Sequence, residues 1–219
     1  MRGDATKKQI SLIFTGDEFR EGISHIRKSL NKQNVKGSFF VTGRFLEDEL
    51  AKSVLKKLYE EGHEVGPHSD QHLLYAPWEK RDSLLVTKET FNKDLTVNIQ
   101  KLHALGIVNI DKFVAPYEWY NTHIAAWTKE LGLSLYNFTP GLRTAADYTD
   151  PEMGSRYMSS EAILDQLVNY EVKEGLHGFI IIIHIGSNPN RTDKFFNQLE
   201  KLIELLKDKN YKFVPLNEL

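Results

Sequence analysis

Apolar residues follow two alternating spacings along this chain, and the alternation predicts strands and helices in turn. Short runs rich in β-branched and aromatic residues are typical of strands. Seven such runs are present, at residues 9–14, 37–41, 63–66, 112–115, 134–138, 178–184 and 212–216. Between them, apolar residues recur every three or four positions, which is the spacing of one helix face. These stripes predict six helices, within residues 19–30, 50–58, 91–102, 124–131, 163–170 and 195–206.

Strands separated by helices predict a parallel sheet with right-handed crossovers. The run from Ile180 to Ile183 is wholly apolar, so this strand should be covered on both faces. An open sheet and a barrel both satisfy this order, and in both the ligand site lies at the carboxyl ends of the strands. Polar residues follow strands at 15–18, 67–72 and 115–118 and at His184. The irregular stretch 139–158 is long enough to be a substrate-facing loop.

Composition narrows the classes of function. The 219 residues are 41% hydrophobic, which suits one domain at 9–219 after a disordered tail at 1–8. The formal charge is −2 with Lys and Arg scattered, so we expect no nucleic-acid partner. Cysteine is absent, which excludes disulfides, thiolate metal sites and a cysteine nucleophile.

The chain carries no sequence signal for a membrane. The longest apolar run, 179–183, is too short to cross a bilayer, and residues 1–8 lack the apolar core of a signal peptide. We therefore expect no membrane span, and a location that is either cytoplasmic or secreted after removal of a signal. The oligomeric state stays open.

The segment from Gly66 to His72 is the most informative stretch for chemistry. It places His68 and His72 four residues apart directly after a predicted strand. Two imidazoles at this spacing can supply two nitrogen ligands to Zn²⁺ if the loop turns helically. The other five histidines are expected to be ordinary surface or helix residues: His25, His63, His103, His123 and His177.

From residue 10 to 219 the chain resembles the polysaccharide deacetylase family, the NodB-homology carbohydrate esterases. Three segments carry the resemblance: Lys36–Gly43, Glu61–Gly66 leading to the histidine pair, and Tyr211–Val214. The resemblance implies an α/β fold, a distorted (β/α) barrel with seven parallel strands. It also implies one divalent metal, usually zinc, held by an Asp and two His, and removal of N- or O-acetyl groups from sugars.

Two family motifs are altered. The first normally offers two adjacent aspartates, a general base and then a metal ligand. Counting back from Phe39 puts Asp17 on the ligand position and Gly16 where the base should be. The third motif normally has an arginine that orients this base, and Val114 stands in its place. The two losses are linked, because an arginine without its carboxylate would be a buried unpaired charge.

The resemblance also assigns the remaining roles. The metal ligands would be Asp17, His68 and His72, a set that suits Zn²⁺, Co²⁺ or Ni²⁺. His184 would be the general acid, the backbone N–H of Tyr117 would hold the oxyanion, and Glu18 or Glu118 could replace the base. Of these two, Glu18 is the predicted catalytic residue. The expected substrate contacts are Pro116, Glu118, Trp119 and Asp147, with the aromatics Tyr75, Trp78, Tyr120 and Tyr148 nearby.

Three functions fit these residues. The favoured one is a metal-dependent deacetylase that acts on acetylated oligo- or polysaccharides with metal-bound water. The second is a catalytically impaired relative that binds carbohydrate. The third is a hydrolase of other non-peptide C–N bonds on the same scaffold.

Overall fold

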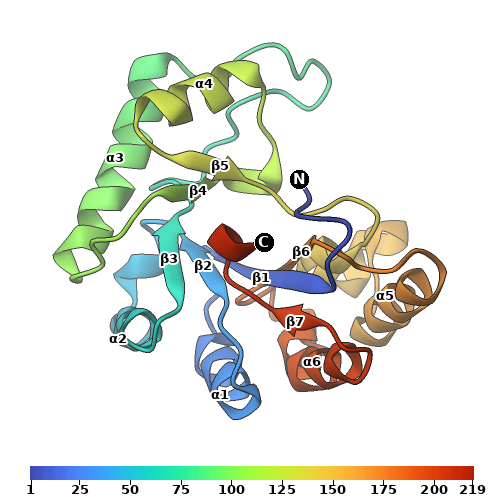
Figure 1. Ribbon diagram of the computed structural model, residues 1–219. Coiled ribbons are helices and arrows are strands. Elements are labelled where there is room, and N and C mark those ends of the chain that lie inside the picture. The colour runs from blue at the N-terminus through green and yellow to red at the C-terminus, as the bar shows by residue number, and fades with distance from the viewer.

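The computed structural model describes residues 1–219, and strands and helices alternate along it (Figure 1). The strands are β1 (Gln9–Gly16), β2 (Ser38–Val41), β3 (Glu64–Pro67), β4 (Lys112–Val114), β5 (Ser134–Tyr136), β6 (Phe179–His184) and β7 (Lys212–Phe213). The helices are α1 (Ile23–Gln33), α2 (Glu49–Glu60), α3 (Lys88–Ala104), α4 (Thr122–Glu130), α5 (Ser160–Glu174) and α6 (Leu199–Asp208). All seven predicted strands and six predicted helices are present, with ends that differ by a few residues.

Every strand pairing is parallel, as the alternation predicts. One sheet has the order β3-β2-β1-β6, with β7 beside the start of β1, and β4 pairs with β5 in a second, two-stranded sheet. The strands therefore form a distorted barrel whose ring of backbone pairing is interrupted on either side of β4 and β5. This confirms the predicted fold class. None of the helices combines the length and apolar character needed to cross a membrane.

Side chains alternate along β1 between two layers of the core. Leu12 and Phe14 pack in the large cluster under the helices, whereas Ile13 lies in the barrel interior with Phe40 and Ile182. The same alternation continues past Phe14, since neighbouring side chains of a strand point to opposite faces. Thr15 therefore faces the barrel interior, and Gly16 faces the outer layer.

Residues 2–4, predicted to belong to a disordered tail, are joined to the domain by hydrogen bonds, although most of residues 1–8 are exposed. The backbone N–H of Gly3 donates to the Gly178 carbonyl at 2.7 Å, and Arg2 Nε donates to the His177 carbonyl at 2.8 Å. The N–H of Asp4 donates to the carbonyl of Leu219 at 3.3 Å. Figure 1 shows the two termini close together at one end of the barrel. The apolar pattern does not predict these contacts, because hydrogen bonds from the backbone and from the Arg2 side chain make them.

His63 is a buried structural residue, which corrects its interpretation as a surface or helix histidine. Its Nδ1 accepts a hydrogen bond from the N–H of Gly37 at 3.1 Å, just before β2. Burial, with the charge of Lys36, lowers the pKa of His63 to about 4.

This histidine should make the fold sensitive to mild acid. Its folded pKa lies below the unfolded value of about 6.5, so the unfolded chain gains the proton first. The free energy of unfolding should fall by about 3 kcal/mol from this group as the pH drops from 6.5 towards 4. The amide oxygen of Asn in His63→Asn can still accept the bond from Gly37 but does not titrate. The free energy of unfolding of this variant, measured with urea, should therefore lack the decrease between pH 6.5 and 4. His103→Asn on an exposed face of α3 is the control. An unchanged pH dependence in His63→Asn would contradict the assignment.

Candidate active site

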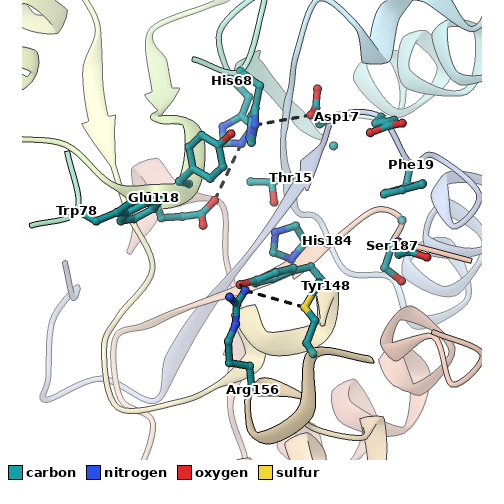
Figure 2. Close-up of a pocket in the computed structure, with 17 residues that line it drawn as sticks. Thr15, Asp17, Phe19, His68, Trp78, Glu118, Tyr148, Arg156, His184 and Ser187 are labelled. Atoms are coloured by element: carbon teal, nitrogen blue, oxygen red, sulfur yellow. Dashed lines mark hydrogen bonds and ion pairs between the residues drawn. The ribbon is translucent and has the colours of Figure 1, made fainter. Parts of the chain in front are cut away.

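A cavity of about 530 Å³ opens at the carboxyl ends of β1, β3 and β6 (Figure 2). Its walls hold, besides Glu18, the side chains of Asp17, His68, His72, Glu118 and His184, which can donate or accept a proton. The rest of the wall is Thr15, Gly16, Glu18, Phe19, Trp78, Tyr117, Tyr148, Met153, Arg156, Gly186, Ser187 and Asn188. The cavity thus lies where the strand order placed the ligand site.

Helix α3 holds the histidine loop in place. The N–H of His68 donates to Asn98 Oδ1 at 3.0 Å. Asp94, one helical turn earlier, accepts the N–H groups of Asp70 and Gln71 at 3.1 and 2.8 Å. A helical turn was expected to bring the two histidines together, but the loop is not helical. The two imidazole centroids nevertheless lie 5.1 Å apart. Asp94 and Asn98 were not predicted as site residues; their signal in the sequence is a pair of polar residues beside the apolar stripe of α3.

Both imidazoles are neutral. Burial lowers the pKa of His68 well below its usual value, and burial also lowers that of His72 to about 4. His68 Nδ1 lies 2.7 Å from the Val114 carbonyl, which can only accept, so this nitrogen carries the proton. Its Nε2 then carries no proton and has a free lone pair, and this atom lies 4.0 Å from Glu118 Oε1.

The three residues predicted as metal ligands do not form a ligand set. His72 Nδ1 is 3.6 Å from Asp17 Oδ2, but the carboxylate of Asp17 is already bound by Arg44 and Thr42. No group of three His, Asp or Glu side chains in the described chain is arranged to hold a metal ion. The expected His₂Asp centre is not assembled in this structure, because the Asp17 carboxylate is paired with a guanidinium, whose positive charge opposes a second cation.

His184 and Asp147 form a tight pair on the opposite wall. Asp147 Oδ1 lies 2.5 Å from His184 Nδ1, and Oδ2 accepts the backbone N–H of His184 at 2.8 Å. Burial alone would lower the pKa of His184, but the charge and hydrogen bond of Asp147 outweigh it and raise the pKa to about 9. Asp147 is buried with both oxygens occupied, so its predicted role as a substrate contact is wrong. It positions and charges His184.

Glu118 is the most buried of the carboxyl groups that line the cavity. Burial raises its pKa to about 7, against the lowering influence of His184. Tyr117 and Glu118 both adopt left-handed backbone conformations, with φ of 58° and 52°. This turn follows β4, and Asn137 Nδ2 donates to the Glu118 carbonyl at 2.8 Å. Figure 2 shows the Glu118 carboxylate and the His184 ring pointing into the same space.

The two glutamates differ in burial in a way that the sequence did not predict. Glu18 is exposed at the cavity edge, whereas Glu118 is almost fully buried in the wall. A carboxyl group with a pKa near neutrality is the better general base, because it ionises near the working pH. The structure therefore favours Glu118 as the catalytic carboxylate.

The family described as Polysaccharide deacetylase matches residues 2–136, more than half of the chain. The chain belongs to the polysaccharide deacetylase family. It is 27% identical to an uncharacterized 30.6 kDa protein in the fumA 3′ region of Geobacillus stearothermophilus, over 99% of this chain and 72% of that protein. It is 23% identical to the peptidoglycan-N-acetylmuramic acid deacetylase PdaA of Bacillus subtilis, over 99% of this chain and 73% of that protein.

A solved structure from Bacillus anthracis shares the fold. It is BA3943, described as a pseudoenzyme of the CE4 family, and it superposes with a TM-score of 0.75 at 19% identity. The match covers all of this chain and 67% of that one. The deacetylase fold therefore occurs both in named deacetylases and in a protein described as a pseudoenzyme.

Some of the other residues that were predicted to contact the substrate line the cavity, and others do not. Tyr117 lines the cavity, and the oxyanion role of its N–H stays a prediction. Pro116 is buried and Trp119 packs against Trp78 in a tilted arrangement; neither lines the cavity, so the structure does not support their assignment as substrate contacts. Trp78 takes the place expected for Trp119.

The long loop faces the cavity as predicted. Tyr148, Met153 and Arg156 line the cavity from this segment. The fully buried Arg191 holds the loop by donating to the carbonyls of Thr149 and Met158 at 2.7 and 3.0 Å. Neither Arg156 nor Arg191 was found from sequence, since single arginines in irregular segments carry no periodic signal.

Proposed function

We propose that this protein hydrolyses an acetyl ester or amide of a carbohydrate in the cavity, with Glu118 as general base and His184 as general acid. One observation carries the proposal: a buried carboxyl with a pKa of about 7 shares the cavity with an imidazole whose pKa is about 9. Between these values Glu118 is ionised while His184 keeps its proton. This is the pair of states that a base and an acid require.

The two groups can complete the reaction. Glu118 accepts a proton from water as the water oxygen bonds to the acyl carbon. The tetrahedral intermediate then collapses, the bond from carbon to the sugar nitrogen or oxygen breaks, and His184 Nε2–H protonates the leaving atom. Asp147 stabilises the imidazolium before this transfer and keeps the ring oriented through Nδ1. The products are acetate and the free amine or alcohol, and the proton on Glu118 replaces the one that left His184.

Family membership and the cavity edge support a carbohydrate substrate. A named relative acts on peptidoglycan N-acetylmuramic acid. Three aromatic side chains at the edge remain well exposed, with 52% for Trp78, 45% for Tyr117 and 41% for Tyr148. Exposed aromatic faces beside a polar cavity suit stacking on a sugar ring. The predicted zinc ion has no part in this proposal, because Arg44 occupies the Asp17 carboxylate.

A second candidate is carbohydrate binding without turnover. The Arg44–Asp17 pair favours it, since the positive charge of the guanidinium opposes a catalytic cation at Asp17. Acetate release from a panel of chitin oligosaccharides, acetylated xylan and peptidoglycan fragments separates the two. We expect release by the wild type and loss of release in His184→Ala. No release from any substrate, together with saturable binding of one of them, would favour the binding protein.

The pH profile of acetate release should be bell-shaped. The apparent second-order rate constant should rise as pH passes about 7, where Glu118 ionises, and fall as pH passes about 9, where His184 loses its proton. Because the groups interact, these values belong to the pair. In Asp147→Asn the carboxylate that raises the pKa of His184 is gone, so the alkaline limb of the residual activity should move to lower pH. An alkaline limb that stays in place would exclude His184 as the acid.

A further inference from the structure

Asp17 has a fixed cation as its partner. Thr42 Oγ1 donates to Asp17 Oδ1 at 2.7 Å, and Arg44 Nε donates to the same oxygen at 3.0 Å. A terminal guanidinium nitrogen of Arg44 contacts Oδ2. The sheet brings Asp17 and Arg44 together, because Gly16 at the end of β1 pairs with Val41 at the end of β2. Both segments leave the sheet side by side.

Arg44 contacts Asp17 from outside the cavity. Asp17 lines the cavity, and Arg44 does not. The guanidinium cannot lose its charge in a protein and fits a carboxylate with two parallel bonds. His72 Nδ1 lies 3.6 Å from the same Oδ2, so the imidazole, the carboxylate and the guanidinium form one cluster. Thr42 and Arg44 together occupy Oδ1, and the guanidinium places a fixed positive charge beside Oδ2, so a divalent cation at Asp17 would be repelled by Arg44.

We propose that Arg44 takes the place of a divalent cation at this cluster. The guanidinium neutralises Asp17, holds its carboxylate in the cavity wall and prevents Asp17, His68 and His72 from gathering around a metal ion. Arg44 is a positioning residue, since it acts through Asp17. Its removal should therefore create metal affinity in a chain that otherwise lacks it.

Titration with Co²⁺ tests the proposal without any assay of activity. The chelator-treated wild type, Arg44→Met and the double variant Arg44→Met/Asp17→Asn are compared by visible absorption and by metal content after gel filtration. We expect weak or no binding by the wild type and one Co²⁺ per chain in Arg44→Met, with a dissociation constant lower by at least about tenfold. The double variant should lose this gain. His68→Ala in the Arg44→Met background should lose it as well.

Two outcomes would overturn the proposal. One is a wild type that binds one equivalent of Co²⁺ as tightly as Arg44→Met, and the other is an Arg44→Met protein that binds no more tightly than the wild type. Thermal unfolding checks that each variant is folded. If Arg44→Met does not fold, Arg44→Gln leaves Asp17 a neutral hydrogen-bond donor and is held to the same comparison. Acetate release is not measured, so failure here is separate from failure of the proposed hydrolysis.

Discussion

Glu118→Gln should lower the rate of acetate release about 10²–10⁴-fold, the usual contribution of a positioned general base. Glutamine matches the volume of glutamate but cannot accept the proton of the attacking water. The measurement is acetate release at pH 8, where the wild-type carboxylate is ionised and His184 is protonated. Glu18→Gln at the exposed edge is the matched control and should change the rate by no more than about twofold.

The same substitution should stabilise the fold. Burial raises the folded pKa of Glu118 to about 7 from an ordinary value of 4.5, so ionisation above pH 4.5 costs stability progressively up to pH 7. At pH 8 the neutral glutamine removes this cost, and the free energy of unfolding should rise by up to about 3 kcal/mol. Lost activity with gained stability distinguishes a catalytic carboxylate from a structural one. A variant that keeps activity within tenfold of wild type, while Glu18→Gln does not, would return the base to Glu18.

The arrangement of elements could be predicted from sequence because apolar spacing reports which face of each element is buried. The apolar run of β6 predicts a strand buried on both faces, and the apolar stripe of α6 predicts a helix buried on one face. The strand–helix order then restricts the topology. The residue pairs of the site obey no such rule. Asp17 and Arg44 are 27 residues apart and Asp147 and His184 are 37 apart, and both pairs meet only when loops fold over the sheet.

The position of the Glu118 carboxylate in the cavity could not be predicted, because it depends on an unusual backbone conformation. Tyr117 and Glu118 are consecutive non-glycine residues in the left-handed region, which costs on the order of 1–3 kcal/mol for each residue. Bonds from the N–H of Glu118 to the Ala115 carbonyl and from Asn137 to the Glu118 carbonyl hold the turn. Propensity favours neither residue there, so tertiary contacts decide where the carboxylate points.

The placement of the base at residue 16 was mistaken for a different reason. The alternation of side chains along β1 shows that residue 15, and not residue 16, points into the cavity. Counting residues from Phe39 placed the base at Gly16, but Phe14 is buried in the outer core and fixes the alternation of β1. Thr15 then faces the cavity, with its hydroxyl buried and without a partner. Gly16 contributes backbone to the cavity wall, while its missing side chain would point the other way.

Gly16→Asp should therefore unfold or severely destabilise the protein rather than supply a base. A Cβ at this position would lie 2.7 Å from the Phe45 ring and 2.9 Å from Ile185, so even Gly16→Ala should cost about 1–3 kcal/mol. The aspartate adds an ionised group facing the apolar core, and an uncompensated buried charge costs about 3–5 kcal/mol. Urea unfolding should show this loss for Gly16→Asp and a clearly smaller one for Thr15→Asp, whose carboxylate would reach the cavity. Both variants add the same charge one residue apart, so the comparison isolates the direction of the side chain. A Gly16→Asp protein as stable as Thr15→Asp would mean that residue 16 faces the cavity, and the base position first inferred from the sequence would be restored.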